Sequence, residues 1–141
     1  MATKIFLDTN IVLDVLDDKR PYHAGAVEIW RMIETNQVDA FISESVVTAT
    51  DYILQKSSGK PRRISLLSDL LVFLQILPCT TTTCTTAFQN TFPDTEDTIL
   101  YQVALEGEVD YFITNDLKAQ KRLSTGSLPV IPTKDFLSIN G

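Results

Sequence analysis

The strongest constraint on the fold is a regular alternation between short apolar segments and longer stretches with helical periodicity. In the helical stretches apolar residues recur every three or four positions, as Ala26, Ile29 and Ile33 do. The short segments, rich in branched and aromatic residues, predict strands. The predicted strands lie at residues 4–7, 40–42, 75–79, 111–114 and 130–131. The predicted helices lie at residues 10–16, 21–36, 45–56, 64–74, 95–106, 117–123 and 134–139. A further short helix is predicted at the end of the threonine-rich stretch 80–86 and runs through Phe88.

Strands that are separated by helices predict a mostly parallel central sheet, because parallel neighbours need a crossover connection, which is usually helical. Helices would then cover both faces of this sheet. The predicted fold class is therefore α/β, a three-layer α/β/α sandwich. No internal repeat or linker-like stretch interrupts the 141 residues, so we expect a single domain over residues 1–141.

Composition and charge narrow the classes of function. The net charge of −6 argues against a protein that attracts nucleic acid by bulk charge, although basic residues gather at 56–63 and 118–122. No apolar run approaches the length of a membrane span, and the N-terminal residues predict a strand rather than a signal peptide. We therefore expect a cytoplasmic protein that does not bind membranes.

Acidic residues follow two of the predicted strands. Asp8 comes directly after the first strand, and Asp116 follows the fourth with only Asn115 between. Open parallel sheets bind ligands at the edge where their strands end. If the two strands are neighbours, both carboxylates emerge at that edge.

A third acidic group lies at the start of a predicted helix, where Asp94, Glu96 and Asp97 fall within four positions. The structural interpretation is a helix cap at Asp94, with acids in the first turn facing the positive end of the helix dipole. Asp8 and Asp116 are also plausible caps. Three acids brought together by folding would repel one another without a cation, and oxygen ligands favour Mg²⁺ or Mn²⁺. Such ions activate water and stabilise phosphodiester displacement.

The sequence lacks the residues that several other kinds of catalytic or binding site require. His23 is the only histidine and lies far from any nucleophile motif, and with Cys79 and Cys84 it cannot complete a usual zinc site. The Gly59-Lys60 pair is followed by proline, so no P-loop is present. A phospho-receiver domain would need an aspartate after the third strand, where Leu77-Pro-Cys-Thr stands instead.

Three motifs in order, Phe6-Leu-Asp-Thr-Asn10, Asp94-Thr-Glu-Asp97 and Asp110-Tyr-Phe-Ile-Thr-Asn-Asp116, resemble those of PIN domains, the PilT N-terminus-like nuclease fold. The likeness covers nearly the whole chain and is greatest to bacterial toxins of the VapC type. It implies a Mg²⁺- or Mn²⁺-dependent endoribonuclease, often a homodimer and often neutralised by a cognate antitoxin. By motif position Asp8, Asp97 and Asp116 would be the metal ligands and catalytic acids, with Glu96 beside them. Asn10, Thr114 and Asn115 would be the polar residues that support the site and contact the substrate.

One position departs from the family pattern. PIN nucleases commonly carry a further acid two turns into the helix after the second strand, and that position falls near Ala49 here. Glu44 lies somewhat early and Asp51 slightly late, and these two acids are the candidates to substitute for it, although some branches of the family lack this acid. The alternative hypothesis is a catalytically weak PIN fold that binds RNA or a partner protein without cutting.

The predicted helix at 64–74 carries more apolar residues than one core-facing stripe requires. We therefore expect one of its faces to pack in a symmetric homodimer. The apolar residues concerned are Leu66, Leu67, Leu70, Leu71, Val72 and Phe73.

Overall fold

The centre of the molecule is a five-stranded sheet in the order β3-β2-β1-β4-β5, with every neighbouring pair parallel. The computed structural model describes residues 2–90 and 92–140. The strands are β1 (Thr3–Leu7), β2 (Val38–Ser43), β3 (Leu74–Leu77), β4 (Tyr111–Ile113) and β5 (Val130–Ile131). The helices are α1 (Thr9–Leu16), α2 (His23–Glu34), α3 (Glu44–Leu54), α4 (Lys60–Leu71), α5 (Thr81–Ala87), α6 (Thr95–Glu106), α7 (Leu117–Arg122) and α8 (Thr133–Asn140).

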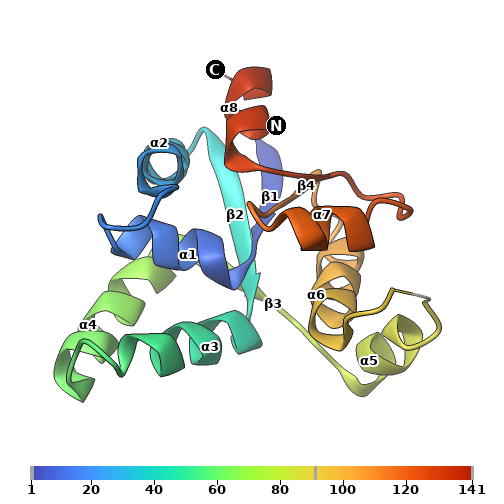
Figure 1. Cartoon of the computed structure of the whole chain (residues 1–141), viewed down its shortest axis with the longest axis horizontal. Coiled ribbons are helices and arrows are strands. Elements are labelled where there is room, and N and C mark those ends of the chain that lie inside the picture. Colours follow the sequence, from blue (N-terminus) through green and yellow to red (C-terminus); the bar gives the residue numbers. More distant parts are fainter. Residues whose placement is uncertain (1, 91, 141) are drawn as a thin grey trace.

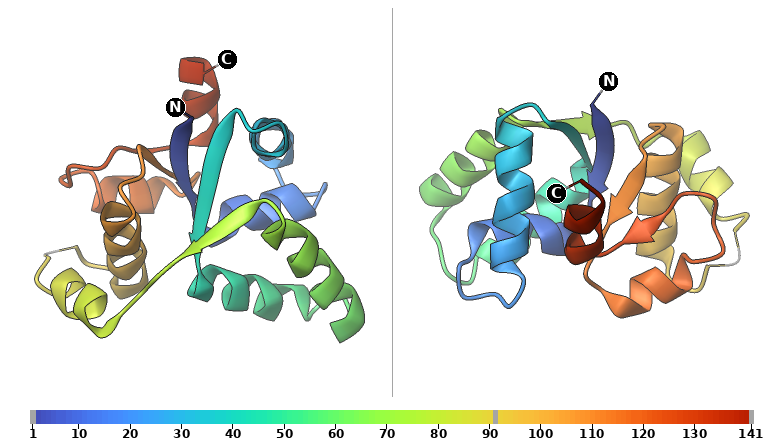
Figure 2. Two further views of the ribbon diagram at one scale, coloured as in Figure 1. Left: turned by 180° about the vertical axis from the view of Figure 1, so that it is seen from behind. Right: turned by 90° about the horizontal axis from the view of Figure 1, so that it is seen from above.

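Helices cover both faces of this sheet. Figure 1 shows α1, α2, α3 and α4 on one side of the strands and α5, α6 and α7 on the other. The view from above in Figure 2 shows the same two layers, and α8 packs against α2 near the N-terminus. The order of the strands explains this division. The chain adds β2 and β3 on one side of β1, and then crosses the opposite face through α5 and α6 to add β4 on the other side.

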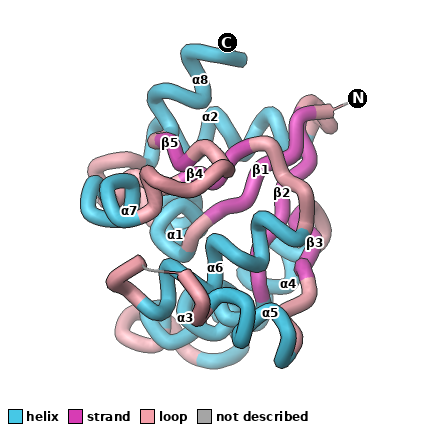
Figure 3. Tube along the Cα trace, turned by 90° about the vertical axis from the view of Figure 1, so that its right-hand side faces the viewer, coloured by secondary structure: helices cyan, strands magenta, loops and turns pink. Residues whose placement is uncertain are grey.

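The core is built on β1, the central strand, and its neighbour β4, which pair in register from Ile5 opposite Tyr111 to Leu7 opposite Ile113. Phe6 and Phe112 are fully buried and stack with their ring centroids 5.2 Å apart. Figure 3 shows these strands side by side in the middle of the sheet. Because they are short and buried on both faces, the residues that follow them emerge together at one edge of the sheet.

The predicted fold class is confirmed, and each predicted strand overlaps an observed one. One predicted helix was wrong at both ends, since its start lies at Lys60, four residues earlier than predicted, with Pro61 in the first turn. The helix predicted at 64–74 is α4, which ends at Leu71, and Leu74 is the first residue of β3. Apolar residues run through this region without glycine or proline, so periodicity alone does not show where the helix gives way to the strand. The threonine-rich stretch does form a helix, α5, which begins with a capping box between Thr80 and Thr83.

Several large apolar side chains of α4 and β3 are exposed to solvent. Leu67 and Leu70 are buried, whereas Ile64, Val72 and Ile76 expose 50%, 74% and 47% of their surface. This matches the expectation that α4 carries more apolar residues than its core-facing side needs. In the described part of the chain, no helix combines the length and the apolarity that crossing a bilayer requires.

Candidate active site

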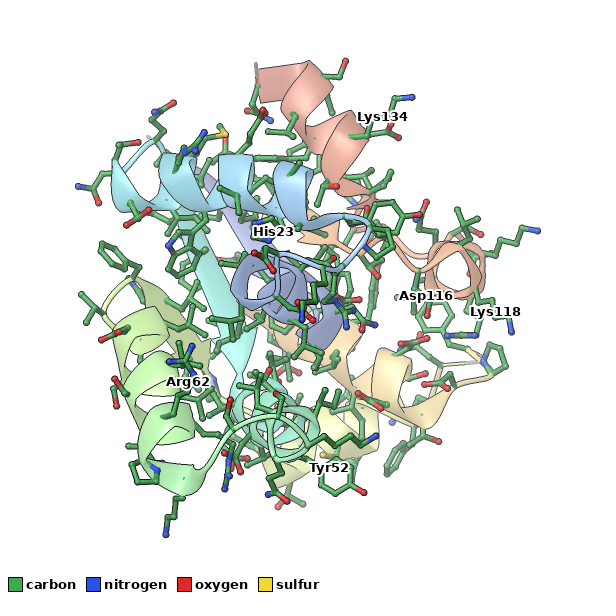
Figure 4. All side chains as sticks on the ribbon, turned by 60° about the vertical axis from the view of Figure 1, so that its left-hand side comes forward. His23, Tyr52, Arg62, Asp116, Lys118 and Lys134 are labelled. Carbon is green, nitrogen blue, oxygen red and sulfur yellow. The ribbon has the colours of Figure 1, made fainter. Side chains whose placement is uncertain are left out.

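The edge of the sheet where β1 and β4 end carries two of the predicted acids. Asp8 directly follows β1, and Asp116 lies three residues beyond the end of β4. The two strands are hydrogen-bonded neighbours, and Leu7 is paired with Ile113 at their ends. Figure 4 labels Asp116 and Lys118 at the start of α7, next to this edge.

Helix α6 supplies the third acid. It lies on the face of the sheet opposite α1, and its first turn carries Glu96 and Asp97. These side chains border the same cavity as Asp8 and Asp116, with a volume of about 190 Å³. The residues that line this acidic cavity are Asp8, Thr9, Asn10, Asp94, Glu96, Asp97, Leu100, Asp116 and Arg122.

Three aspartates around the cavity are also helix caps. Asp8 Oδ1 accepts a hydrogen bond from the Ile11 amide at 3.0 Å, and Asp116 Oδ1 accepts one from the Lys118 amide at 2.9 Å. Asp94 Oδ1 caps α6 through the Asp97 amide at 2.9 Å. The capping interpretation is therefore correct for each of these residues. It does not exclude a functional role, because a carboxylate offers about four acceptor sites and a cap uses only part of them.

Asp8 is the most buried acid of the cavity, with 9% of its surface exposed. Burial raises the pKa of Asp8 to about 6, against the opposing effect of hydrogen bonds from Thr114 and from the Ile11 amide. Thr114 is itself fully buried and donates its hydroxyl to Asp8 Oδ2. Thr114 therefore contacts the second oxygen of Asp8, and its role as a polar residue that supports the site stays a prediction.

Asp97 is paired with a cation from α7. Arg122 donates through Nε and Nη2 to Asp97 Oδ2, at 2.8 and 2.5 Å. Arg122 Nη2 also lies 3.9 Å from Asp116 Oδ2. Burial raises the pKa of Asp97, and the hydrogen bond with Arg122 acts in the opposite direction. One guanidinium thus lies against two of the three candidate ligands.

The remaining predicted polar residues lie at the margin of the cavity. Asn10 lines it, but its Oδ1 accepts a hydrogen bond from Arg20 Nη2 at 3.1 Å. Asn115 Oδ1 accepts from the backbone amide of Thr133 at 3.0 Å, so this side chain connects the end of β4 to the start of α8. Asn115 lines a neighbouring cavity together with Asn10, Asp116 and Tyr22. The structure thus brings Asn10 next to the acids and directs Asn115 Oδ1 toward Thr133.

The sequence did not pair Arg122 with an acid, although it placed this residue in a basic group. Arg122 follows Ala119 by three positions on α7, and Ala119 and Leu123 are buried. Helical spacing therefore places Arg122 at the border of the buried face, which was the available signal. Its partner lies 25 positions away in sequence, beyond the reach of any local pattern.

The proposed substitutes for the missing acid lie elsewhere. Among the described residues, neither Glu44 nor Asp51 belongs to those that line the acidic cavity. Asp51 Oδ1 accepts a hydrogen bond from Arg63 Nε at 2.8 Å, and this bond lowers the pKa of Asp51. Ala49 is half-buried on α3. The geometry therefore gives no support to either substitute.

The donor set of the cavity suits a hard divalent cation, since it consists of carboxylates and hydroxyls. Thr9 Oγ1 is buried there with no hydrogen-bond partner among the described residues. Within residues 2–90 and 92–140, however, no three His, Cys, Asp or Glu side chains are arranged so that they could hold one metal ion. The oxygen ligands of the cavity thus fit the predicted Mg²⁺ or Mn²⁺. The carboxylate of Asp97, however, points toward Arg122.

The chain is similar to known proteins in both sequence and fold. The chain is 26% identical to Ribonuclease VapC1 of Aquifex aeolicus (strain VF5), over 140 residues that cover 96% of this chain and 94% of that protein. Its fold resembles that of VapC20 from Mycobacterium tuberculosis, a Sarcin-Ricin loop cleaving toxin, with a TM-score of 0.60 and 14% identity over 77% of this chain and 86% of the other.

A second solved structure has a similar fold over more of the chain. It is VapBC2 from Rickettsia felis bound to a DNA fragment from their promoter, with a TM-score of 0.63 and 17% identity over 92% of this chain and 97% of the other. A sequence profile of the PIN domain matches residues 4–118, which include all three candidate ligands. The protein therefore belongs to the PIN domain family.

Proposed function

We propose that the protein is an endoribonuclease that hydrolyses RNA phosphodiester bonds with Mg²⁺ or Mn²⁺ held by Asp8, Asp97 and Asp116. The observation that carries this proposal is that three aspartates from three separate elements line one cavity at the edge of the sheet. Capping explains Asp8 and Asp116 singly and the ion pair with Arg122 orients Asp97, but neither explains why all three carboxylates line one cavity. The similarity to Ribonuclease VapC1 supports the same reaction.

The residues in and around the cavity would have different roles in binding the metal and the RNA. Asp8, Asp97 and Asp116 would hold the cation through their carboxylates, and the caps of α1 and α7 use only part of the acceptor capacity of Asp8 and Asp116. Thr114 holds Asp8 in place, and Glu96 is an exposed carboxylate at the mouth of the cavity. When bound, the metal supplies an activated water and charge stabilisation at the phosphate. Exposed Lys118 and Lys121 on α7 would contact the RNA backbone and contribute affinity that weakens with salt.

The partners we propose follow from the likeness to VapC proteins. An RNA is the substrate, and a cognate antitoxin protein neutralises the enzyme, which then acts as the toxin of the pair. The Rickettsia felis structure, which holds VapBC2 on promoter DNA, supports such a pairing. Because both partners would be met in the cytoplasm, we propose that location for this protein.

The direct test is cleavage of RNA by the purified protein. Single-stranded RNA should be cut in Mn²⁺ or Mg²⁺, and a chelator should stop the reaction. Cleavage should be faster in Mn²⁺ than in Mg²⁺. Mg²⁺ gives up its bound water more reluctantly, so the lack of one carboxylate ligand should weaken Mg²⁺ binding more than Mn²⁺ binding. Intact RNA across varied substrates, with either metal present, would contradict the proposal.

The second candidate function is a binding module, and the observation that favours it is Ala49 at the position of the missing acid. Ala49→Glu separates the two functions. In an enzyme that already cleaves, this substitution should change the rate modestly. In a binding module that holds RNA intact, it should confer cleavage that the wild-type protein lacks.

We also propose that the exposed apolar residues of α4, of β3 and of the turn between them, which holds Val72, form a symmetric homodimer interface. Light scattering at micromolar concentration should then give twice the chain mass, and Val72→Glu should give the monomer mass, because a charge would be buried at the interface. Ile139→Glu on α8 is the matched control, since Ile139 is 59% exposed on a different element. A monomeric wild-type protein would end this proposal.

A further inference from the structure

Arg122 is the one cationic residue among the described residues that line the acidic cavity. It is the last residue of α7, and its guanidinium reaches from that helix to the first turn of α6. Both of the N–H donors that it directs there bind the same oxygen, Asp97 Oδ2. The side chains of Arg122 and Asp97 are 24% and 18% exposed, so this ion pair is more sheltered from water than a surface pair.

A divalent cation in this cavity would need the carboxylate that Arg122 holds. Asp97 Oδ2 already accepts two hydrogen bonds, and the guanidinium also lies 3.9 Å from Asp116 Oδ2. A positive group so close to two candidate ligands repels a second positive charge. It also neutralises part of the negative charge that would attract one.

We propose that Arg122 is a built-in counter-ion of the acidic cavity, which competes with divalent metal for Asp97 and so sets the metal affinity of the protein. This inference rests on the proposed function, because it takes Asp97 as a metal ligand. In this role Arg122 gives up Asp97 when a cation binds. In the opposite role, Arg122 holds Asp97 in the orientation that metal binding requires. Substitution of Arg122 would then weaken metal binding instead of strengthening it.

The test is calorimetric titration of Mn²⁺ into wild-type protein, Arg122→Gln and Lys121→Gln. Lys121 is the matched control, because it is exposed on the same helix, loses the same charge and does not line the cavity among the described residues. We expect Arg122→Gln to lower the dissociation constant for Mn²⁺ about three- to tenfold, and the control to change it less than about twofold.

Two further measurements keep the inference falsifiable if Arg122→Gln folds poorly. Arg122→Lys keeps the charge but loses the planar fork that binds one oxygen through two donors, so its Mn²⁺ affinity should lie between those of wild type and Arg122→Gln. The melting temperature should rise with Mn²⁺ more steeply in Arg122→Gln than in wild type, since tighter binding stabilises the folded state more at a given concentration.

The outcomes separate this inference from the proposed function. If the wild-type protein cleaves RNA in Mn²⁺ while Arg122→Gln binds Mn²⁺ equally or more weakly, the counter-ion role is wrong and the enzyme stands. If only Arg122→Gln binds Mn²⁺, the counter-ion role stands and the wild-type protein is not a metal-dependent enzyme. If neither protein binds Mn²⁺, both proposals fail.

Discussion

Asp8→Asn, Asp97→Asn and Asp116→Asn are each expected to reduce metal-dependent RNA cleavage at least about hundredfold. The three carboxylates would share one cation, so removing one disables the unit rather than a third of it. Substitutions in the outer shell of metal sites already cost roughly ten- to hundredfold, and a ligand should cost more. Initial rates on one RNA substrate, measured in saturating Mn²⁺, give the comparison.

The choice of asparagine makes this result interpretable. Asparagine caps helices about as well as aspartate, so Asp8→Asn and Asp116→Asn keep the caps of α1 and α7 while they remove the charge. Asp69→Asn, at an exposed position of α4, is the control for loss of one negative charge and should leave the rate unchanged. Variants that retain most of the wild-type rate would show that Asp8 and Asp116 are caps only and that Asp97 serves only in its ion pair with Arg122.

The sequence predicted the fold well where pattern and tertiary structure agree. Strands β1 and β4 were predicted from short apolar runs, and they are neighbours, which was the condition for the acids that follow them to emerge at one edge. The boundary between α4 and β3 was wrong, because Leu74 continues an apolar run in which helix and strand periodicities cannot be separated.

The candidate site was predictable in its acids but not in its electrostatics. Asp8 and Asp116 could be chosen because each follows a strand that ends at one edge of a parallel sheet, whereas Asp97 was chosen by its position in the family motif; all three line one cavity. The ion pair between Arg122 and Asp97 depends on how α6 and α7 pack across that edge, which no local spacing encodes. The hydrogen bond that Asp8 accepts from Thr114 likewise joins residues 106 positions apart in the sequence.

Asp8→Asn is expected to stabilise the fold at neutral pH in the presence of a chelator. Burial raises the pKa of Asp8 from its ordinary value of 3.8 to about 6. The folded protein therefore binds a proton at Asp8 between about pH 4 and pH 6 that the unfolded chain has released. It follows that the contribution of Asp8 to the free energy of unfolding falls as the pH rises through this window, and the ionised form at neutral pH is destabilising by up to about 3 kcal/mol.

The measurement is the difference in the free energy of unfolding between Asp8→Asn and wild type, by denaturant titration at pH 7.5 and at pH 4. All other titrating groups are common to the two proteins, so the difference isolates Asp8 to first order. Asparagine keeps an oxygen for the Ile11 amide, so the cap of α1 is retained. The advantage of Asp8→Asn should be largest at pH 7.5 and should shrink toward pH 4, where the wild-type carboxyl is protonated in the folded state. An advantage that is equal at both pH values, or larger at pH 4, would mean that the carboxylate of Asp8 is no less stable in the folded protein than in water.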